Sequence, residues 1–184
     1  MEILKAKVER LLITQPFDAK PIHASKLQLL LDGIKYDRHF GKTRNSDVRT
    51  ARLLSKGIET ANLRQVTIIS SEELSEISET MGIEALPDHL EANITLSGIK
   101  DFTKLSPGTF IKFPRNTILF VTGENLPCVV VSENMMRHGL ERKAALQFPK
   151  AAFGKRGVTA MIFAAGFIKE GDEVEVYPPQ DFEK

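Results

Sequence analysis

The chain holds a single cysteine, Cys128, which follows Pro127 and precedes three valines. A lone thiol excludes an internal disulfide and any zinc site built from several cysteines. Free cysteine is commonly a small buried hydrophobe. Because proline cannot donate to a sheet, however, the segment predicts that Cys128 is the first residue of a strand at a sheet edge. A thiolate in that position could act as a nucleophile or as the ligand of a soft metal.

Two basic stretches accompany the cysteine in a chain whose formal net charge is only +1. Residues 35–56 carry seven Lys and Arg against two Asp, and residues 137–156 carry six against one Glu. If these stretches fold beside Cys128, they would favour its thiolate and attract an anion. Arginine is well suited to phosphate, although a solvated surface is an equally common role for such a loop. The small net charge argues against a general nucleic-acid binder.

The histidines show none of the spacings that build a zinc site or a metalloprotease centre. A structural or surface role is the default for each of them. Histidine partners of a nucleophilic cysteine meet it in space rather than in sequence, so a pair between Cys128 and His39 or His138 stays open. The four histidines are His23, His39, His89 and His138.

Short apolar runs separated by turn residues predict a chain of many strands and few helices. Ser70 followed by Glu73 is a capping-box pattern, which predicts a helix ending at Gly82. Pro107 and Gly108 predict a type II turn. The expected strands lie at residues 6–14, 66–69, 90–99, 110–113 and 174–176, with two further apolar strand runs inside residues 116–134.

Two segments depart from this strand pattern. Residues 34–57 are polar and weakly periodic, which predicts a long surface loop with one helical turn near residues 48–54. Loops of this length in compact domains are usually functional or disordered. Residues 132–150 have a helical pattern, with an interruption at Gly139 and a stop at Pro149.

With 184 residues, 42% of them hydrophobic and 27% charged, the chain has the composition of an ordinary globular protein. We expect one domain over residues 1–184, mainly β with a few helices and barrel-like in form. The apolar runs are too short to span a membrane, and charges stand where a signal peptide would be apolar. We therefore expect a cytoplasmic protein that uses neither membrane nor nucleic acid.

Three motifs are specific when taken together: Asn-Ile-x-x-x-Gly from Asn93, Pro127-Cys128 after an apolar run, and a closing glycine-rich hairpin. With their surroundings they occur in the order and spacing of the MOSC domain, the domain named after the C-terminal part of molybdenum-cofactor sulfurases. The chain resembles this family over about four fifths of its length. The resembling segments are residues 32–41, 64–74, 91–99, 105–113, 121–128 and 154–176.

The resemblance implies a β-barrel-like MOSC fold in which Cys128 either carries sulfur as a persulfide or ligates molybdenum in a bound molybdopterin cofactor. It also implies that Arg38 and His39 line the ligand pocket, with Asn93 near it. One departure is Tyr36, which occupies the position where the family has glycine before Asp-Arg.

Three hypotheses follow, two of them based on the resemblance. In the first, the protein binds molybdenum cofactor through Cys128 and reduces N-hydroxylated or related substrates with electrons from a partner reductase. In the second, Cys128 accepts a persulfide from a pyridoxal-phosphate-dependent cysteine desulfurase for metal-sulfur cofactor assembly. The third hypothesis is a non-catalytic module that binds a small anion, with Cys128 merely buried.

Overall fold

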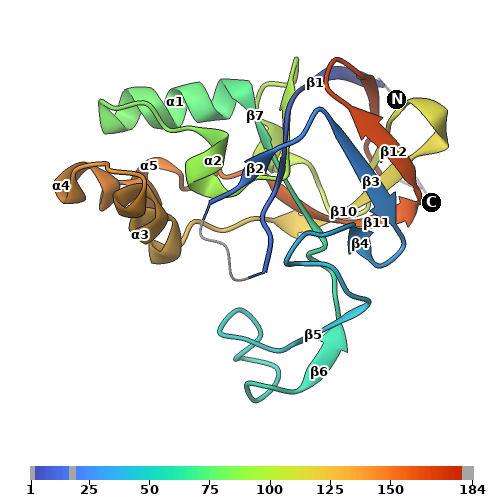
Figure 1. Ribbon diagram of the computed structural model, residues 1–184, viewed down its shortest axis with the longest axis horizontal. Coiled ribbons are helices and arrows are strands. Elements are labelled where there is room, and N and C mark those ends of the chain that lie inside the picture. The colour runs from blue at the N-terminus through green and yellow to red at the C-terminus, as the bar shows by residue number, and fades with distance from the viewer. Residues whose placement is uncertain (1–2, 17–19, 180–184) are drawn as a thin grey trace, which may run out of the picture.

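The computed structural model describes residues 3–16 and 20–179, and its centre is a closed β-barrel (Figure 1). Seven strands follow one another in the order β13, β9, β10, β11, β7, β8 and β1, and β1 pairs again with β13. Strands β7 and β8 run parallel, and the other neighbours in the barrel are antiparallel. The expected mainly β, barrel-like fold is thus confirmed. The barrel strands are β1 (Leu4–Ile13), β7 (Val66–Ser70), β8 (Ile94–Ser97), β9 (Phe110–Lys112), β10 (Ile118–Glu124), β11 (Val158–Ala164) and β13 (Glu173–Tyr177).

Alternation of side chains explains why these segments close around one core. Successive residues of a strand point to opposite faces of the sheet. In β13, Val174 and Val176 are therefore buried inside the barrel, whereas Glu173 is exposed. Lys112 of β9 reaches across the outer face to Glu175, with 3.0 Å between Nζ and Oε2. The strands expected at residues 6–14, 66–69, 110–113 and 174–176 correspond to β1, β7, β9 and β13. Of the strand or extended segment expected at 90–99, only β8 is a strand, and Leu90 ends a short helix.

Smaller elements flank the barrel. Strands β12, β3 and β4 form a second sheet, and β2 pairs with the end of β1. Gly108, with φ of 92°, turns the chain into β9 at the expected Pro-Gly position. The short strands are β2 (Ile22–His23), β3 (Lys26–Leu30), β4 (Gly33–Ile34) and β12 (Gly166–Lys169), and two single 3₁₀ turns are η1 (Phe102–Lys104) and η2 (Pro114–Asn116).

The α-helices gather on one side of the barrel (Figure 1). Helix α1 begins after Ser70, whose Oγ accepts from the Glu73 N–H at 3.1 Å, and ends at Gly82, whose φ is 68°. These are the predicted limits. A second apolar cluster fills the space among the helices, and none of the helices in the described part of the chain could cross a membrane. The helices are α1 (Ser71–Met81), α2 (Pro87–Leu90), α3 (Val129–Arg137), α4 (Arg142–Ala145) and α5 (Phe148–Ala151).

Helix α3 stands where the sequence predicted a strand. Cys128 is the N-cap of α3 and not the first residue of a strand. The three valines favour a strand through their β-branched side chains, but packing decides otherwise. Val131 and Met135, one helical turn apart, are both buried in the apolar cluster among the helices. The predicted stop at Pro149 is also wrong, because this proline lies in the first turn of α5, where its missing N–H is not needed.

Residues 43–61 form a lobe that projects from the barrel (Figure 1). Its base is a hairpin of β5 (Thr43–Asn45) and β6 (Glu59–Ala61), and its tip consists of turns. Within the tip, the N–H groups of Leu53 and Leu54 donate to the Thr50 carbonyl and close a single turn. The predicted loop therefore has a paired base, with the expected turn near its middle.

Candidate functional site

Cys128 lies half-buried between the end of β10 and the start of α3. Its sulfur is 3.7 Å from Nη1 of Arg156, which also donates to the Leu126 carbonyl at 2.5 Å. Arg156 is 9% exposed, and its buried Nε has no hydrogen-bond partner among the residues that the structure describes. Burial lowers the pKa of Arg156, and negative charge on Cys128 acts in the opposite direction. The guanidinium of Arg156 is therefore held beside the sulfur, and its Nε–H can still donate a hydrogen bond to a ligand.

The start of α3 adds a second favourable element for negative charge. The N-terminus of a helix exposes backbone N–H groups and carries a partial positive charge. The backbone of Cys128 is extended, with φ of −143°, and the helix continues for nine residues after it. A thiolate or persulfide on Cys128 would therefore lie between a guanidinium and the positive end of a helix.

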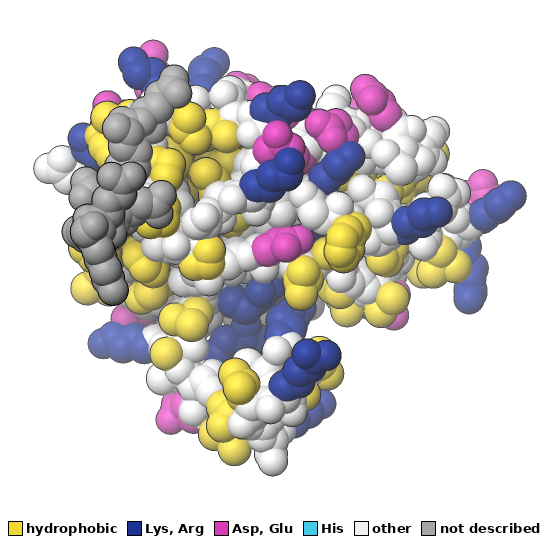
Figure 2. Space-filling view, turned by 180° about the vertical axis from the view of Figure 1, so that it is seen from behind, with side chains coloured by type: hydrophobic (Ala, Val, Ile, Leu, Met, Phe, Trp, Pro, Cys, Tyr) yellow, Lys and Arg dark blue, Asp and Glu magenta, His cyan; other side chains and the backbone are white. Residues whose placement is uncertain are grey.

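Arg156 and three arginines coupled to it or to Arg64, namely Arg44, Arg49 and Arg64, are here called the basic recess. Arg44 and Arg49 also donate to Asp47 at 2.7 Å. The pKa of Arg64 is lowered to about 10, first by burial and then by the charges of the other three arginines. Arg64 donates to Oδ1 of Asn125 at 2.8 Å, close to the turn that leads to Cys128. Figure 2 shows Lys and Arg side chains gathered in the hollow between the barrel and the lobe. The two basic stretches of the sequence thus meet in space beside the thiol.

Asp37 organises the loop that carries Arg38 and His39. Its carboxylate is 2% exposed and accepts from the backbone N–H and Nδ1 of His39 and from the Thr14 N–H, at 2.9 to 3.0 Å. Burial alone would raise the pKa of Asp37, but the hydrogen bonds and charge of His39, with the Thr14 N–H, lower it below its ordinary value of 3.8. The ionised carboxylate therefore holds this loop against the barrel.

Arg38 forms an ion pair with Glu91, which follows α2. The Arg38 side chain is 37% exposed and that of Glu91 only 6% exposed, so the pair lies at the edge of the interior. The charge of Glu91 also acts on the pKa of Arg156 and raises it. This coupling places the Arg38–Glu91 pair within electrostatic range of the group that contacts Cys128.

Asn93 is 1% exposed and lies beneath the Arg38–His39 loop. Its Nδ2 donates to Asp37 at 2.9 Å, and its Oδ1 accepts from the Thr67 N–H at 3.0 Å. The structure thus brings Asn93 together with Asp37 and the loop, in a position that supports them. Binding of a ligand by Arg38, His39 and Asn93 stays a prediction.

Neither histidine considered as a partner of Cys128 is hydrogen-bonded to it within residues 3–16 and 20–179. The His39 ring is bonded to Asp37 at 3.0 Å. The His138 ring packs edge-on against His89, with 5.2 Å between the ring centroids. The partner that the structure provides for the sulfur is Arg156, which the sequence placed at the end of a basic stretch and inside a segment that resembles the family, without assigning it a role.

Tyr36 adopts a backbone conformation that favours glycine. Its φ is 71°, in the left-handed region that only glycine adopts without strain. Its ring is 66% exposed, and Lys35 Nζ lies 5.0 Å from the ring centroid. The loop before Asp37 and Arg38 therefore holds a non-glycine residue in a left-handed conformation.

The barrel, with one thiol beside an arginine at a helix start, defines a MOSC-domain protein. The profile of the MOSC domain matches residues 35–175, and the chain belongs to this family. YuaD of Bacillus subtilis (strain 168), whose name suggests a role in metal-sulfur cluster biosynthesis, is 37% identical over 181 residues, which cover 96% of this chain and 93% of YuaD.

Solved structures agree with this assignment. The crystal structure of Bacillus subtilis YuaD superposes with a TM-score of 0.92 at 35% identity, over 97% of this chain and 99% of that one. YiiM from Escherichia coli, at 13% identity, has a TM-score of 0.59 over 95% of this chain and 71% of its own. YiiM from Geobacillus stearothermophilus, also at 13% identity, has a TM-score of 0.64 over 95% and 75%. The two YiiM structures share the fold.

Proposed function

We propose that this protein is a sulfur carrier, in which Cys128 accepts a sulfane sulfur and holds it as a persulfide for metal-sulfur assembly. The observation that carries the proposal is the contact between the sulfur of Cys128 and Arg156, at the N-terminus of α3. A persulfide is anionic, and both of these neighbours favour an anion. The name of the relative YuaD, which refers to metal-sulfur cluster biosynthesis, also supports a role in metal-sulfur assembly.

The transfer step balances without an outside oxidant. The Cys128 thiolate attacks the terminal sulfur of a persulfide on the donor, which is a cysteine desulfurase in this proposal. A new S–S bond forms on Cys128 as the donor's S–S bond breaks, and the donor cysteine leaves as a thiolate. Arg156 stays beside the anion before and after transfer, because the negative charge moves by only one sulfur atom.

Incubation with a cysteine desulfurase, pyridoxal phosphate and cysteine tests the proposal. The peptide that contains Cys128 should gain the mass of one sulfur atom, and reduction with dithiothreitol should remove it. Cys128→Ser, which preserves the shape of the side chain, is the control and should stay unmodified. Absence of the added mass on wild-type protein, under conditions that load an established sulfur carrier, would refute the proposal.

The basic recess favours a second candidate, the binding of molybdenum cofactor. A half-buried thiolate is a suitable soft ligand, and the unpartnered Nε of Arg156 fits a phosphate-bearing group such as molybdopterin. When bound, the cofactor would supply redox chemistry, with N-hydroxylated compounds as substrates and a separate protein as electron donor. In this candidate Cys128 holds the metal, and Arg64 and Arg156 neutralise the phosphate.

Metal analysis separates the two candidates. Wild type and Cys128→Ser are purified without oxygen from cells that make the cofactor, and molybdenum is measured per chain. Molybdenum that depends on Cys128 would support the second candidate. Equal and negligible metal in both proteins would reject it.

A further inference from the structure

Exposed apolar side chains border Cys128 along the chain. Leu126, Val129 and Val130, here called the Cys128 rim, are 57%, 61% and 50% exposed. Helix α3 directs Val131 and Met135 into the cluster among the helices, which leaves the two preceding valines on the solvent side. Large apolar side chains grouped around a reactive group commonly mark a surface that another molecule covers.

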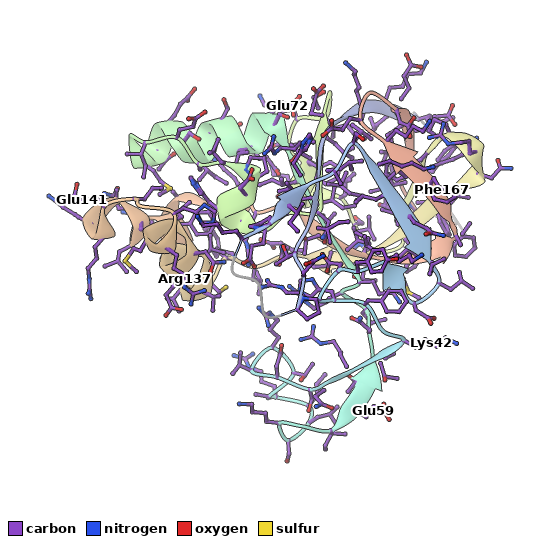
Figure 3. The ribbon with its side chains drawn as sticks, viewed as in Figure 1. Lys42, Glu59, Glu72, Arg137, Glu141 and Phe167 are labelled. Carbon is purple, nitrogen blue, oxygen red and sulfur yellow. The ribbon has the colours of Figure 1, made fainter. Side chains whose placement is uncertain are left out.

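The rim stands next to strong positive charge. Arg156, Arg64 and Arg49 influence one another electrostatically, and Arg156 contacts the sulfur at the centre of the rim. Figure 2 shows hydrophobic side chains along the borders of the hollow that contains the Lys and Arg side chains. In Figure 3 the labelled Glu59 marks the lobe, and Arg137 marks α3. A protein that docks at Cys128 would therefore contact the apolar side chains of the rim and, deeper in the hollow, the arginines of the basic recess.

We infer that the Cys128 rim and the basic recess together dock the persulfide-bearing loop of a sulfur-donor protein, a loop with acidic residues and apolar residues beside its cysteine. The inference rests on the sulfur-carrier function proposed above. Because Cys128 is half-buried, a donor must present its sulfur on a protruding loop. The rim supplies apolar contact for that loop, and charge complementarity with the basic recess selects acidic loops.

Two synthetic peptide persulfides test whether the basic recess selects acidic donor loops. One carries Asp and Leu beside the persulfidated cysteine, and the other has Lys in place of each Asp. At low ionic strength the acidic peptide should load wild-type protein about tenfold faster, and added salt should reduce this advantage. Equal loading rates for the two peptides would overturn the inference.

A double substitution tests whether the Cys128 rim provides apolar contacts to the donor loop. Val129→Ser with Val130→Ser keeps residues that a helix start tolerates and removes the apolar contacts. The rate of loading by the acidic peptide is divided by the rate of loading by a small donor whose only charged group is its persulfide, the persulfide of N-acetylcysteine amide. We expect this ratio to fall about tenfold, since each lost contact is worth about 0.7 kcal/mol. Ile3→Ser, at a position 44% exposed near the N-terminus, is the matched control and should leave the ratio unchanged.

The remaining outcomes separate the inference from the proposal on which it rests. An unchanged ratio in the double variant overturns the docking surface while the sulfur carrier stands. A wild-type dimer that the double variant converts to monomer, measured by light scattering, would show that a second copy covers the rim, and this also overturns the inference. No loading from any donor, the small one included, would refute the sulfur carrier itself and the docking surface with it.

Discussion

At the scale of single residues, the site depends on what surrounds one sulfur atom. Arg156 is almost fully buried, its Nη1 faces Cys128, and within the described part of the chain its Nε has no hydrogen-bond partner. A buried cation lacking full compensation destabilises the fold unless an anion is nearby. The pair is therefore arranged so that the anionic persulfide proposed for Cys128 would compensate the buried guanidinium.

Substitution of Arg156 tests this arrangement. Arg156→Gln should slow persulfide loading of Cys128 about ten- to a hundredfold, because a hydrogen bond to a charged group contributes about 1.5–3 kcal/mol. Arg156→Lys restores the charge and should recover part of the rate. Loading kinetics are followed by mass spectrometry, with circular dichroism to confirm the fold. A Gln variant that loads like wild type would show that Arg156 has no part in the chemistry.

The sequence predicted part of this residue-scale picture. Cys128 stood out as the one thiol, and family resemblance pointed to the loop of Arg38 and His39. Arg64 and Arg156 lie in two of the segments that resemble the family, but neither was assigned to the site, because only closure of the barrel brings these distant segments together. The two basic stretches predicted positive charge near Cys128, but they did not indicate which side chain contacts the sulfur.

At the scale of elements, the loop after β4 and the start of α3 are positioned in different ways. The loop is held by buried polar bonds to Asp37, whereas α3 is held by apolar packing. Local propensity misled the prediction for α3, since three valines favour a strand until packing of Val131 and Met135 is considered. The capped helix α1 was predictable because Ser70 and Gly82 are local signals.

The Asp37 bonds predict how stability changes with pH. The pKa of Asp37 in the folded protein lies below its ordinary value of 3.8. The ionised carboxylate therefore adds to the free energy of unfolding above pH 3.8, and this stabilisation is lost as the pH falls through the lower folded-state pKa. Asp37→Asn should lower the free energy of unfolding by about 1–3 kcal/mol at neutral pH. In urea titrations the deficit should shrink below pH 3.8.

Asp101→Asn is the matched control for that measurement. The Asp101 side chain is 55% exposed and pairs with Lys104, itself 75% exposed. Exposed pairs contribute little, and asparagine tolerates the positive φ of this position. An Asp37 variant no less stable at neutral pH than this control would contradict the role given to the Asp37 carboxylate.

At the scale of the whole molecule, a closed barrel is the frame from which the helices and the lobe extend. Strand β11 begins directly after Arg156 and Gly157 and pairs with both β10 and β7. The alternating strands were visible in the sequence, but their order and the return of β1 to β13 depend on contacts between distant residues. The barrel was expected from turn spacing and family resemblance, and the circular strand order was not derivable from local patterns.

Gly157 shows how tightly the barrel constrains the site. A Cβ at this position would lie 1.9 Å from the Ile68 carbonyl oxygen, and the φ of 77° disfavours any side chain. Gly157→Ala should therefore destabilise the protein by about 3 kcal/mol or more. Gly154→Ala, with φ of 69° and open space around the added Cβ, should lose only about 1 kcal/mol. Similar thermal unfolding of the two variants would contradict the predicted constraint at β7.

The central claim is that Cys128 carries sulfane sulfur, and the most direct measurement is its amount per chain. Protein purified without reductant is treated with cyanide, and the thiocyanate formed is compared between wild type and Cys128→Ser after exposure to a desulfurase and cysteine. We predict close to one sulfane sulfur per wild-type chain and none in the variant. Thiocyanate at the level of the variant in fully folded wild-type protein would contradict the account.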